Sequence, residues 1–173
     1  LNGDYQPTKG EYLLDGVQKH FSSPHEAIQE GISVIYQERQ ILLELSVAEN
    51  IYLGRMPSKK FGIIDKAKAN QMAQKIIDDF GLPISPTTKV KDLSIAYQQM
   101  VEIMKAYSRE NLKVICFDEP TASLSDAEID SLFEIIAKLK AQGKIIIYVS
   151  HRMKEIQQIA DKVAIFKDGH YVD

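Results

Sequence analysis

The sequence contains one cysteine, Cys116, and has no long apolar run. Because there is no second cysteine, an internal disulfide cannot form, which fits a protein of a reducing compartment. No stretch reaches the roughly 20 apolar residues that a membrane-spanning helix requires. Any role at a membrane would therefore depend on a partner protein. The net charge of −3 leaves no basic excess for binding nucleic acid or anionic lipid.

The 173 residues, 45% of them apolar, suit one domain with a substantial core. The last third alternates between strand and helix patterns, which is typical of a parallel sheet with crossover helices. The residues from about 38 to 107 instead follow a helical pattern, and Asp168-Gly169 predicts a hairpin turn. The expected strands are 32–36, 114–117, 144–149 and 162–167, with helices at about 126–141 and 152–160.

Several local signals predict where helices begin and end. Three Ser-x-x-Glu sequences are typical of capping boxes, and they lie at 23–26, 46–49 and 125–128. Asp65 can cap a helix that Gly81 ends. A further helix begins near Ser94. Its apolar stripe favours a place in the core, and it consists of Tyr97, Met100, Val101, Met104 and Tyr107.

The run 114–121 places two adjacent carboxylates, Asp118 and Glu119, directly after an apolar strand. Ligands bind beyond the carboxyl ends of parallel strands in open α/β sheets. There, one carboxylate can hold Mg²⁺ on a nucleotide and a second can act on the attacking water. The alternative is a core strand that stops at two solvated acids.

Polar residues also follow the other expected strands. Gln37 follows the strand 32–36, and Ser150-His151 follows the strand 144–149. Between them lies the segment 93–99, Leu-Ser-Ile-Ala-Tyr-Gln-Gln, which opens a helix, and the loop 123–126 follows the paired carboxylates. This ordered set resembles the ATP-binding cassette of ABC transporters. The segments 31–38 and 45–55 are similar to the bacterial sugar importers of the ribose, galactose and xylose type.

The resemblance implies an α/β fold of the P-loop NTPase-like (RecA-like) class, with a parallel sheet core and an inserted helical subdomain. Residues 1–37 would form core segments up to the glutamine loop. Residues 38–107 would form the helical subdomain with the signature segment. Residues 108–173 would complete the core with the Walker B strand, the D-loop and the switch histidine.

The resemblance also implies roles for the residues that follow the strands, with ATP and Mg²⁺ as cofactors. Asp118 and Gln37 would contact the metal, and Gln37 would also contact the attacking water. Glu119 would polarise that water or accept its proton. His151 would donate a hydrogen bond to the γ-phosphate.

The signature segment would contact the nucleotide held by an opposite cassette. Its residues with this implied role are Ser94, Ile95, Ala96 and Gln98. The family usually has glycine where Ile95 stands, and glycine lets a backbone approach phosphate more closely. Ser123 and Asp126 of the D-loop would communicate with the other site, although a helix cap is sufficient to explain that loop.

The sequence contains no G-x-x-x-x-G-K-[ST] motif, the loop that cradles nucleotide phosphates. In the family this loop precedes a segment similar to 1–7. We therefore expect a fragment that begins after the phosphate loop and first strands, and that is inactive alone.

The implied partners are a second cassette, in the same polypeptide or in a homodimer, and transmembrane permease subunits. A sugar-binding protein would act indirectly, and nucleic acid is not expected. The site of action would be the cytoplasmic face of a bacterial membrane, with the chain bound peripherally. Two alternatives remain: a soluble ABC ATPase that acts on DNA or ribosomes, and a non-catalytic or regulatory module.

Overall fold

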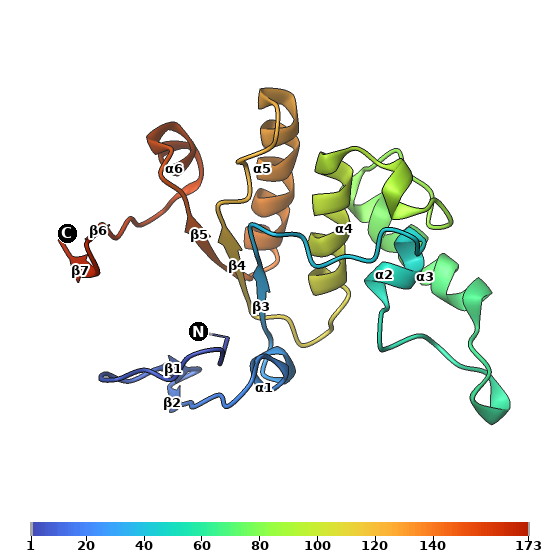
Figure 1. The fold of residues 1–173 in the computed structure, drawn as a ribbon, viewed down its shortest axis with the longest axis horizontal. Helices are drawn as coiled ribbons and strands as arrows, with labels where there is room; N and C mark the ends of the chain where they lie inside the picture. Colours follow the sequence, from blue (N-terminus) through green and yellow to red (C-terminus); the bar gives the residue numbers. More distant parts are fainter. Residues whose placement is uncertain (1, 173) are drawn as a thin grey trace.

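A computed structural model describes residues 2–172, and a parallel sheet lies at its centre. The sheet has the strand order β3-β4-β5 (Figure 1), with bounds β3 (Ile32–Ile35), β4 (Val114–Asp118) and β5 (Ile145–Val149). Ile35 lies beside Phe117 and Asp118 lies beside Val149. The carboxyl ends of the three strands therefore meet at one edge, and the following loops lie close together.

Eight helical segments surround or extend from this sheet within residues 2–172. Three of them flank the strands: α1 (Pro24–Gln29), α5 (Asp126–Ala141) and α6 (Met153–Ile159). The others lie between β3 and β4: α2 (Val47–Ile51), the 3-10 helix η1 (Lys60–Gly62), α3 (Lys66–Phe80), the 3-10 helix η2 (Val90–Asp92) and α4 (Ile95–Tyr107).

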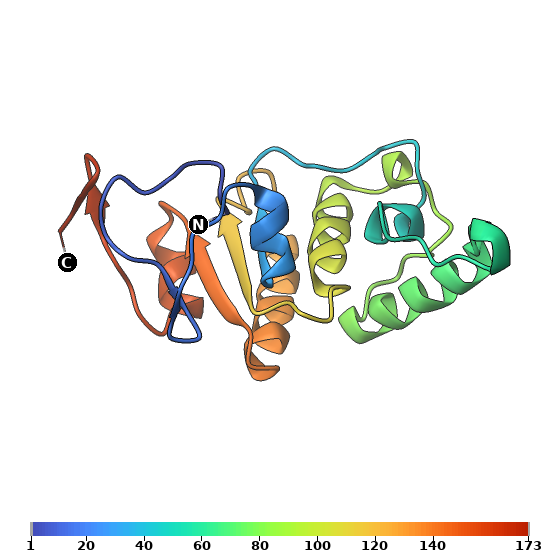
Figure 2. The ribbon, with the colours of Figure 1, turned by 90° about the horizontal axis from the view of Figure 1, so that it is seen from below.

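Helix α4 lies between the sheet and the helices α2 and α3, and the view in Figure 2 shows the same order. Met100, Val101 and Met104 are buried, as the apolar stripe predicts. They belong to one continuous core with Phe117 of β4 and Ile51 of α2. Since α4 contacts both groups of elements, it joins the helical region to the sheet through apolar packing.

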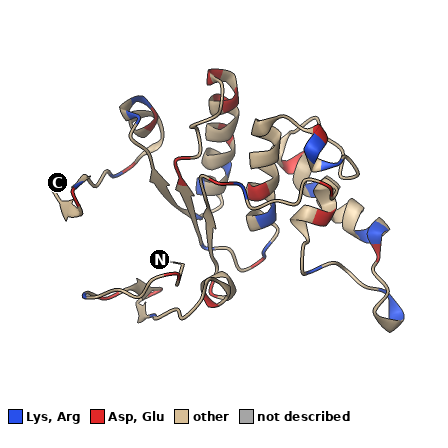
Figure 3. Cartoon of the chain, viewed as in Figure 1, with Lys and Arg blue, Asp and Glu red and all other residues tan. Residues whose placement is uncertain are grey.

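The expected helix boundaries are largely confirmed. Ser46 and Glu49 form a complete capping box at the start of α2. Asp65 caps α3, which ends at Gly81 in the left-handed conformation. Acidic residues occupy the first turn of α5 and basic residues its last turn, where they complement the helix dipole (Figure 3).

The expected capping box at Ser23 and Glu26 is only half correct. The Ser23 hydroxyl accepts the Glu26 N–H and caps α1, as predicted. The Glu26 carboxylate, however, accepts hydrogen bonds from the N–H and hydroxyl of Ser22 at 2.8 and 2.7 Å. The Glu26 carboxylate is therefore bound by the residue before the N-cap rather than by the N-cap itself.

The expected strand 162–167 is wrong. Only Phe166–Lys167 form a strand, β6, and it pairs with β7 (His170–Tyr171) in a hairpin rather than with the parallel sheet. The hairpin signal was correct, because Asp168 and Gly169 both have positive φ. Short-range turn geometry therefore governs this segment. A similar hairpin near the other end joins β1 (Leu13–Leu14) to β2 (Val17–Gln18).

Gly31 is required where α1 turns into β3. Its φ is +95°, and an added Cβ would lie 2.1 Å from the Asn111 carbonyl oxygen. Its carbonyl oxygen accepts hydrogen bonds from the N–H groups of Lys113 and Val114. This close approach aligns the start of β3 with β4. Among residues 2–172, no helix has the length and apolar character to cross a bilayer.

Candidate functional site

Three loops leave the sheet at the same edge. Because Ile35 is level with Phe117, Gln37 and Glu119 each come two residues beyond a matched pair. Asp118 is paired with Val149, so His151 also comes two residues beyond a matched position. The sequence prediction that polar residues follow these three strands is consistent with this register.

Glu119 and His151 lie in contact. His151 Nδ1 is 3.1 Å from Glu119 Oε1. The Glu119 backbone has a φ of 46°, in the left-handed region that non-glycine residues rarely adopt. Its N–H donates to the Val149 carbonyl at 3.0 Å, which holds the turn against β5. An unusual backbone held by its surroundings is a common feature of functional sites.

Asp118 and Gln37 are exposed at the same edge. Residues 2–172 contain no group of three or more His, Cys, Asp or Glu side chains arranged to hold a metal ion. Mg²⁺ prefers oxygen ligands and usually takes only one or two from the protein, the rest coming from water and phosphate. A single exposed carboxylate with a nearby amide fits that kind of site.

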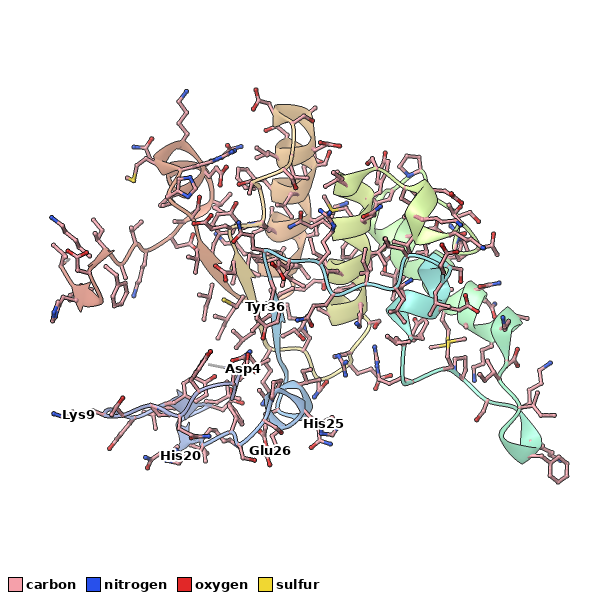
Figure 4. All side chains as sticks on the ribbon, viewed as in Figure 1. Asp4, Lys9, His20, His25, Glu26 and Tyr36 are labelled. Atoms are coloured by element: carbon pink, nitrogen blue, oxygen red, sulfur yellow. The ribbon has the colours of Figure 1, made fainter. Side chains whose placement is uncertain are left out.

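Tyr36, the first residue after β3, is hydrogen-bonded to the N-terminal segment. The Tyr36 hydroxyl donates to Asp4 Oδ2 at 2.9 Å, and the Asn2 amide contacts the same hydroxyl. Figure 4 shows Asp4 beside Tyr36. Burial, followed by its hydrogen bond to Asp4, raises the pKa of Tyr36, so the hydroxyl stays neutral and can donate.

A buried carboxylate beneath the site was missed by the sequence interpretation. Glu155 of α6 is 5% exposed, and it accepts hydrogen bonds from Thr121 at 2.8 Å, Tyr148 at 2.9 Å and Ser150 at 3.0 Å. Arg152 Nη1 lies 3.3 Å from Glu155 Oε1, the oxygen that also accepts from Thr121. Glu155 therefore connects the loop after β4 to the end of β5. These hydrogen bonds hold Ser150, the residue next to His151, in place.

The charge of Glu155 is stabilised by these contacts. Burial acts to raise the pKa of Glu155, but the hydrogen bonds from Thr121, Tyr148 and Ser150 and the charge of Arg152 together hold it below its ordinary value. The only early sign in the sequence was a glutamate at helical spacing after His151. Nothing in that pattern showed that it faces inward.

The signature segment begins α4 as expected. The Ser94 hydroxyl accepts the Tyr97 N–H at 3.4 Å and caps the helix. The Gln98 amide donates to the carbonyls of Val90 and Leu93 at 3.3 and 3.1 Å. Gln98 therefore holds the turn that precedes the helix.

Ile95 and Ala96, the first two residues of α4 after the cap Ser94, lie at the N-terminal end of the helix. Ile95 is 44% exposed, whereas the Ala96 side chain is buried. The first N–H groups of a helix have no partner within it, so they can bind an anion. The exposed Ile95 side chain belongs to the first residue of this helix end.

The D-loop residues Ser123 and Asp126 are exposed. Asp126 is the first residue of α5, after Ser125, whose N–H and hydroxyl both donate to Glu128 at 2.9 Å. The helix cap therefore leaves both candidate residues accessible to a partner.

A hollow of about 530 Å³ lies between α5 and α6, away from these residues. Its walls include Phe133, Lys140 and Ile159, and none of the candidate site residues lines it. The shared edge of the strands, rather than this hollow, gathers the polar groups that could act on a nucleotide.

Two comparisons with known sequences bear on this geometry. The family described as "ABC transporter" matches residues 1–122. An arabinose import ATP-binding protein, AraG, from Mannheimia succiniciproducens is 47% identical over 173 residues, which cover 100% of this chain and 34% of the relative. The AraG protein of an Escherichia coli strain is 48% identical over 172 residues, 99% of this chain and 34% of the relative. The chain thus spans about a third of the length of these curated relatives.

Solved structures share the fold. A nucleotide-free ATP-binding cassette from an ABC transporter matches with a TM-score of 0.83 and 24% identity, over 99% of this chain and 71% of that one. The protein cbiO1 from Clostridium perfringens, part of the ABC transporter complex cbiONQ, matches with a TM-score of 0.81 and 20% identity, over 99% and 67%.

Proposed function

Because this chain belongs to the ABC transporter family, we propose that it is part of the ATP-binding and ATP-hydrolysing subunit of a bacterial sugar importer. The observation that carries the proposal is the contact between Glu119 and His151 beside the exposed Asp118. The likeness to the two arabinose import proteins supports a sugar as the imported solute.

The sheet core and the helical region would have different roles. Residues 1–37 and 108–173, of which residues 1 and 173 lie outside the described part, would form the nucleotide-facing core, and residues 38–107 would form the helical subdomain that carries the signature segment. The absence of strands between β3 and β4 among the described residues supports this division.

Asp118 and Gln37 are the residues that would hold Mg²⁺ on bound ATP. The metal would neutralise charge that develops on the phosphates. Glu119 accepts a proton from the attacking water, since an ionised carboxylate has free acceptor oxygens beyond the one that faces His151. With both ring nitrogens protonated, His151 would donate Nδ1–H to Glu119 and Nε2–H to the terminal phosphate, so that Glu119 orients the ring for that contact.

A second cassette, in the same polypeptide or in a homodimer, would complete the site. Ser94, Ile95 and Ala96 of this chain would present the N-terminus of α4 to the terminal phosphate held by that cassette. Ser123 and Asp126 would meet the other cassette across the interface. The Ile95 side chain would weaken this half-site, because it limits how close the helix end can come.

The loop after Gln37 would couple the site to permease subunits at the cytoplasmic face of the membrane. Leu42 and Leu43 are 48% and 47% exposed, while Ile41 packs against the core. Two adjacent exposed leucines on a held loop suit a partner helix from the permease. A sugar-binding protein would act through that permease, and we expect no role for nucleic acid.

The 173 residues alone would not hydrolyse ATP at a useful rate. They lack the phosphate-binding motif whose backbone N–H groups and lysine supply binding and charge stabilisation. The function therefore belongs to the full-length protein.

The test is an import assay. The full-length protein, its permease and its sugar-binding protein are reconstituted in vesicles, and ATP turnover is measured with and without sugar. The proposal predicts sugar-stimulated turnover and uptake. ATP turnover that is the same with and without the permease would support a soluble ATPase. ATP binding without turnover would support a non-catalytic module. Either result contradicts the proposal.

A further inference from the structure

Glu102 is a buried carboxylate that the proposed chemistry does not use. It lies in α4 and is 6% exposed. One carboxylate oxygen, Oε1, accepts the backbone N–H of Gln40, and the other, Oε2, has no hydrogen-bond partner among residues 2–172. Burying a carboxylate with one unpaired oxygen is costly, and an apolar residue would avoid that cost. A polar role for Glu102 would explain why a carboxylate stands there.

Lys105 contacts the same residue of the loop. It lies one helical turn after Glu102, on the same face of α4, and its Nζ donates to the Gln40 carbonyl at 3.4 Å. Glu102 and Lys105 thus hold both backbone polar groups of Gln40. Burial raises the pKa of Glu102, and the Gln40 N–H, Lys105 and Arg39 oppose that rise.

The loop is tied to a second helix just beyond Gln40. Asn50 of α2 is fully buried, and its Oδ1 accepts the Leu42 N–H at 2.8 Å. The Asn50 amide donates to the Leu42 carbonyl at 2.9 Å. Because α2 packs against α4, both attachments belong to one packed body. The residues before them, 37–39, are exposed.

We propose that Glu102 and Lys105 are positioning residues that clamp Gln40 to α4. From Gln40 onward the loop then moves with the helices, and residues 36–39 form the direct chain connection from β3 to this body. A shift of α4 would reach Gln37 through the two intervening residues, Glu38 and Arg39. The effect of the clamp on ATP turnover rests on the function proposed for Gln37, but the clamp itself does not.

Amide hydrogen exchange in the full-length protein tests the clamp directly, resolved at Gln40. Glu102→Met keeps the length of the side chain and removes its acceptors. It should speed exchange of the Gln40 amide by roughly tenfold or more, since a hydrogen bond to a charged group is lost. Glu102→Gln keeps an acceptor oxygen and should leave this amide protected. Glu110→Met, at an exposed site after α4, is the matched control and should change nothing.

A role in stability alone would give a different pattern. The clamp predicts that the amides of Ile103 and Met104, in the centre of α4, stay protected in Glu102→Met. If methionine unfolds the protein, Glu102→Asp serves instead, because its shorter side chain draws the carboxylate away from Gln40. Unchanged exchange at Gln40, or equal acceleration throughout α4, would overturn the proposal.

ATP turnover with the cognate permease tests the positioning role. Glu102→Met should lower kcat several-fold with the Kd for ATP unchanged, and Glu102→Gln should restore kcat. Faster exchange at Gln40 with unaltered kcat would overturn the role in positioning Gln37. If the full-length protein proved to be no ATPase, the proposed function would fail while the exchange result still decided the clamp.

Discussion

His151 Nδ1 lies 3.1 Å from Glu119 Oε1, although the two residues follow different strands. An ionised carboxylate can only accept, so Nδ1 carries the proton in this contact. The Nε2 atom of a neutral ring is then an acceptor. To donate to a phosphate through Nε2, His151 must be protonated or must release Glu119. The pair can therefore report whether a phosphate is present.

His151→Ala should lower ATP turnover of the full-length protein by roughly a hundredfold, which is typical for loss of one donor to a developing charge. His20→Ala is the matched control, because His20 lies away from the edge where β3, β4 and β5 end (Figure 4). Steady-state phosphate release measures the effect. Turnover of the His151 variant equal to that of the His20 variant would remove His151 from the site.

Thr121→Val should destabilise the protein by about 1–3 kcal/mol, because it removes a buried donor to Glu155 with little change of shape. Thr8→Val, at an exposed position, should stay within about 0.5 kcal/mol of the wild type. Urea unfolding measures both. If Thr121→Val is as stable as Thr8→Val, the hydrogen bond from Thr121 to Glu155 does not contribute to stability as described.

Glu49 should give the protein a stability that is lost in acid. The Ser46 N–H, followed by the ion pair with Lys66 and the Ser46 hydroxyl, lowers the pKa of Glu49 from 4.5 to about 2. A lowered pKa in the folded state stabilises it above the unfolded value, and this contribution disappears as the pH falls from about 4.5 to about 2.

Glu49→Gln should cost about 1 kcal/mol at pH 7, a modest figure because Glu49 and Lys66 are partly exposed. The difference from wild type should shrink between pH 4.5 and 2.5 in urea unfolding experiments. Glu110→Gln should show no such trend. A difference that stays constant over this range would contradict the role of the Glu49 charge.

Cysteines at Leu42 and Leu43 should crosslink to the cytoplasmic loops of the cognate permease, because both side chains are exposed on a held loop. Cys116 is first changed to alanine to remove the native thiol. Cysteines at Ile165 and Phe166, which are exposed near the β6-β7 hairpin, are the controls. Crosslinks from the control positions alone would move the coupling surface to the other side of the molecule.

The sequence predicts the parts of this fold that depend on local signals. The strands β4 and β5, the cap at Asp65 and the end at Gly81 are confirmed, because periodicity and capping act over a few residues. The strand predicted at 162–167 is wrong, because an apolar run predicts a strand without showing whether a neighbouring strand is available to pair with it.

The supporting polar contacts were not predicted at all. Glu102, Asn50 and Glu155 are polar residues on helices, where the sequence pattern predicts exposure. Glu102 and Glu155 have partners far along the chain, Gln40 and Thr121 respectively, and Asn50 of α2 holds Leu42 in the preceding loop. Only the tertiary fold brings such groups together, so a single sequence names the residues at strand ends but not the residues that hold them.

The measurement that tests the central claim most directly compares ATP binding and ATP turnover in the full-length protein with Glu119→Gln. The amide keeps the shape of the side chain but is a far weaker base. We predict an unchanged Kd for ATP and a turnover lowered by at least roughly a hundredfold, with Glu134→Gln behaving as wild type. Near wild-type turnover in Glu119→Gln would show that this glutamate is not the catalytic base.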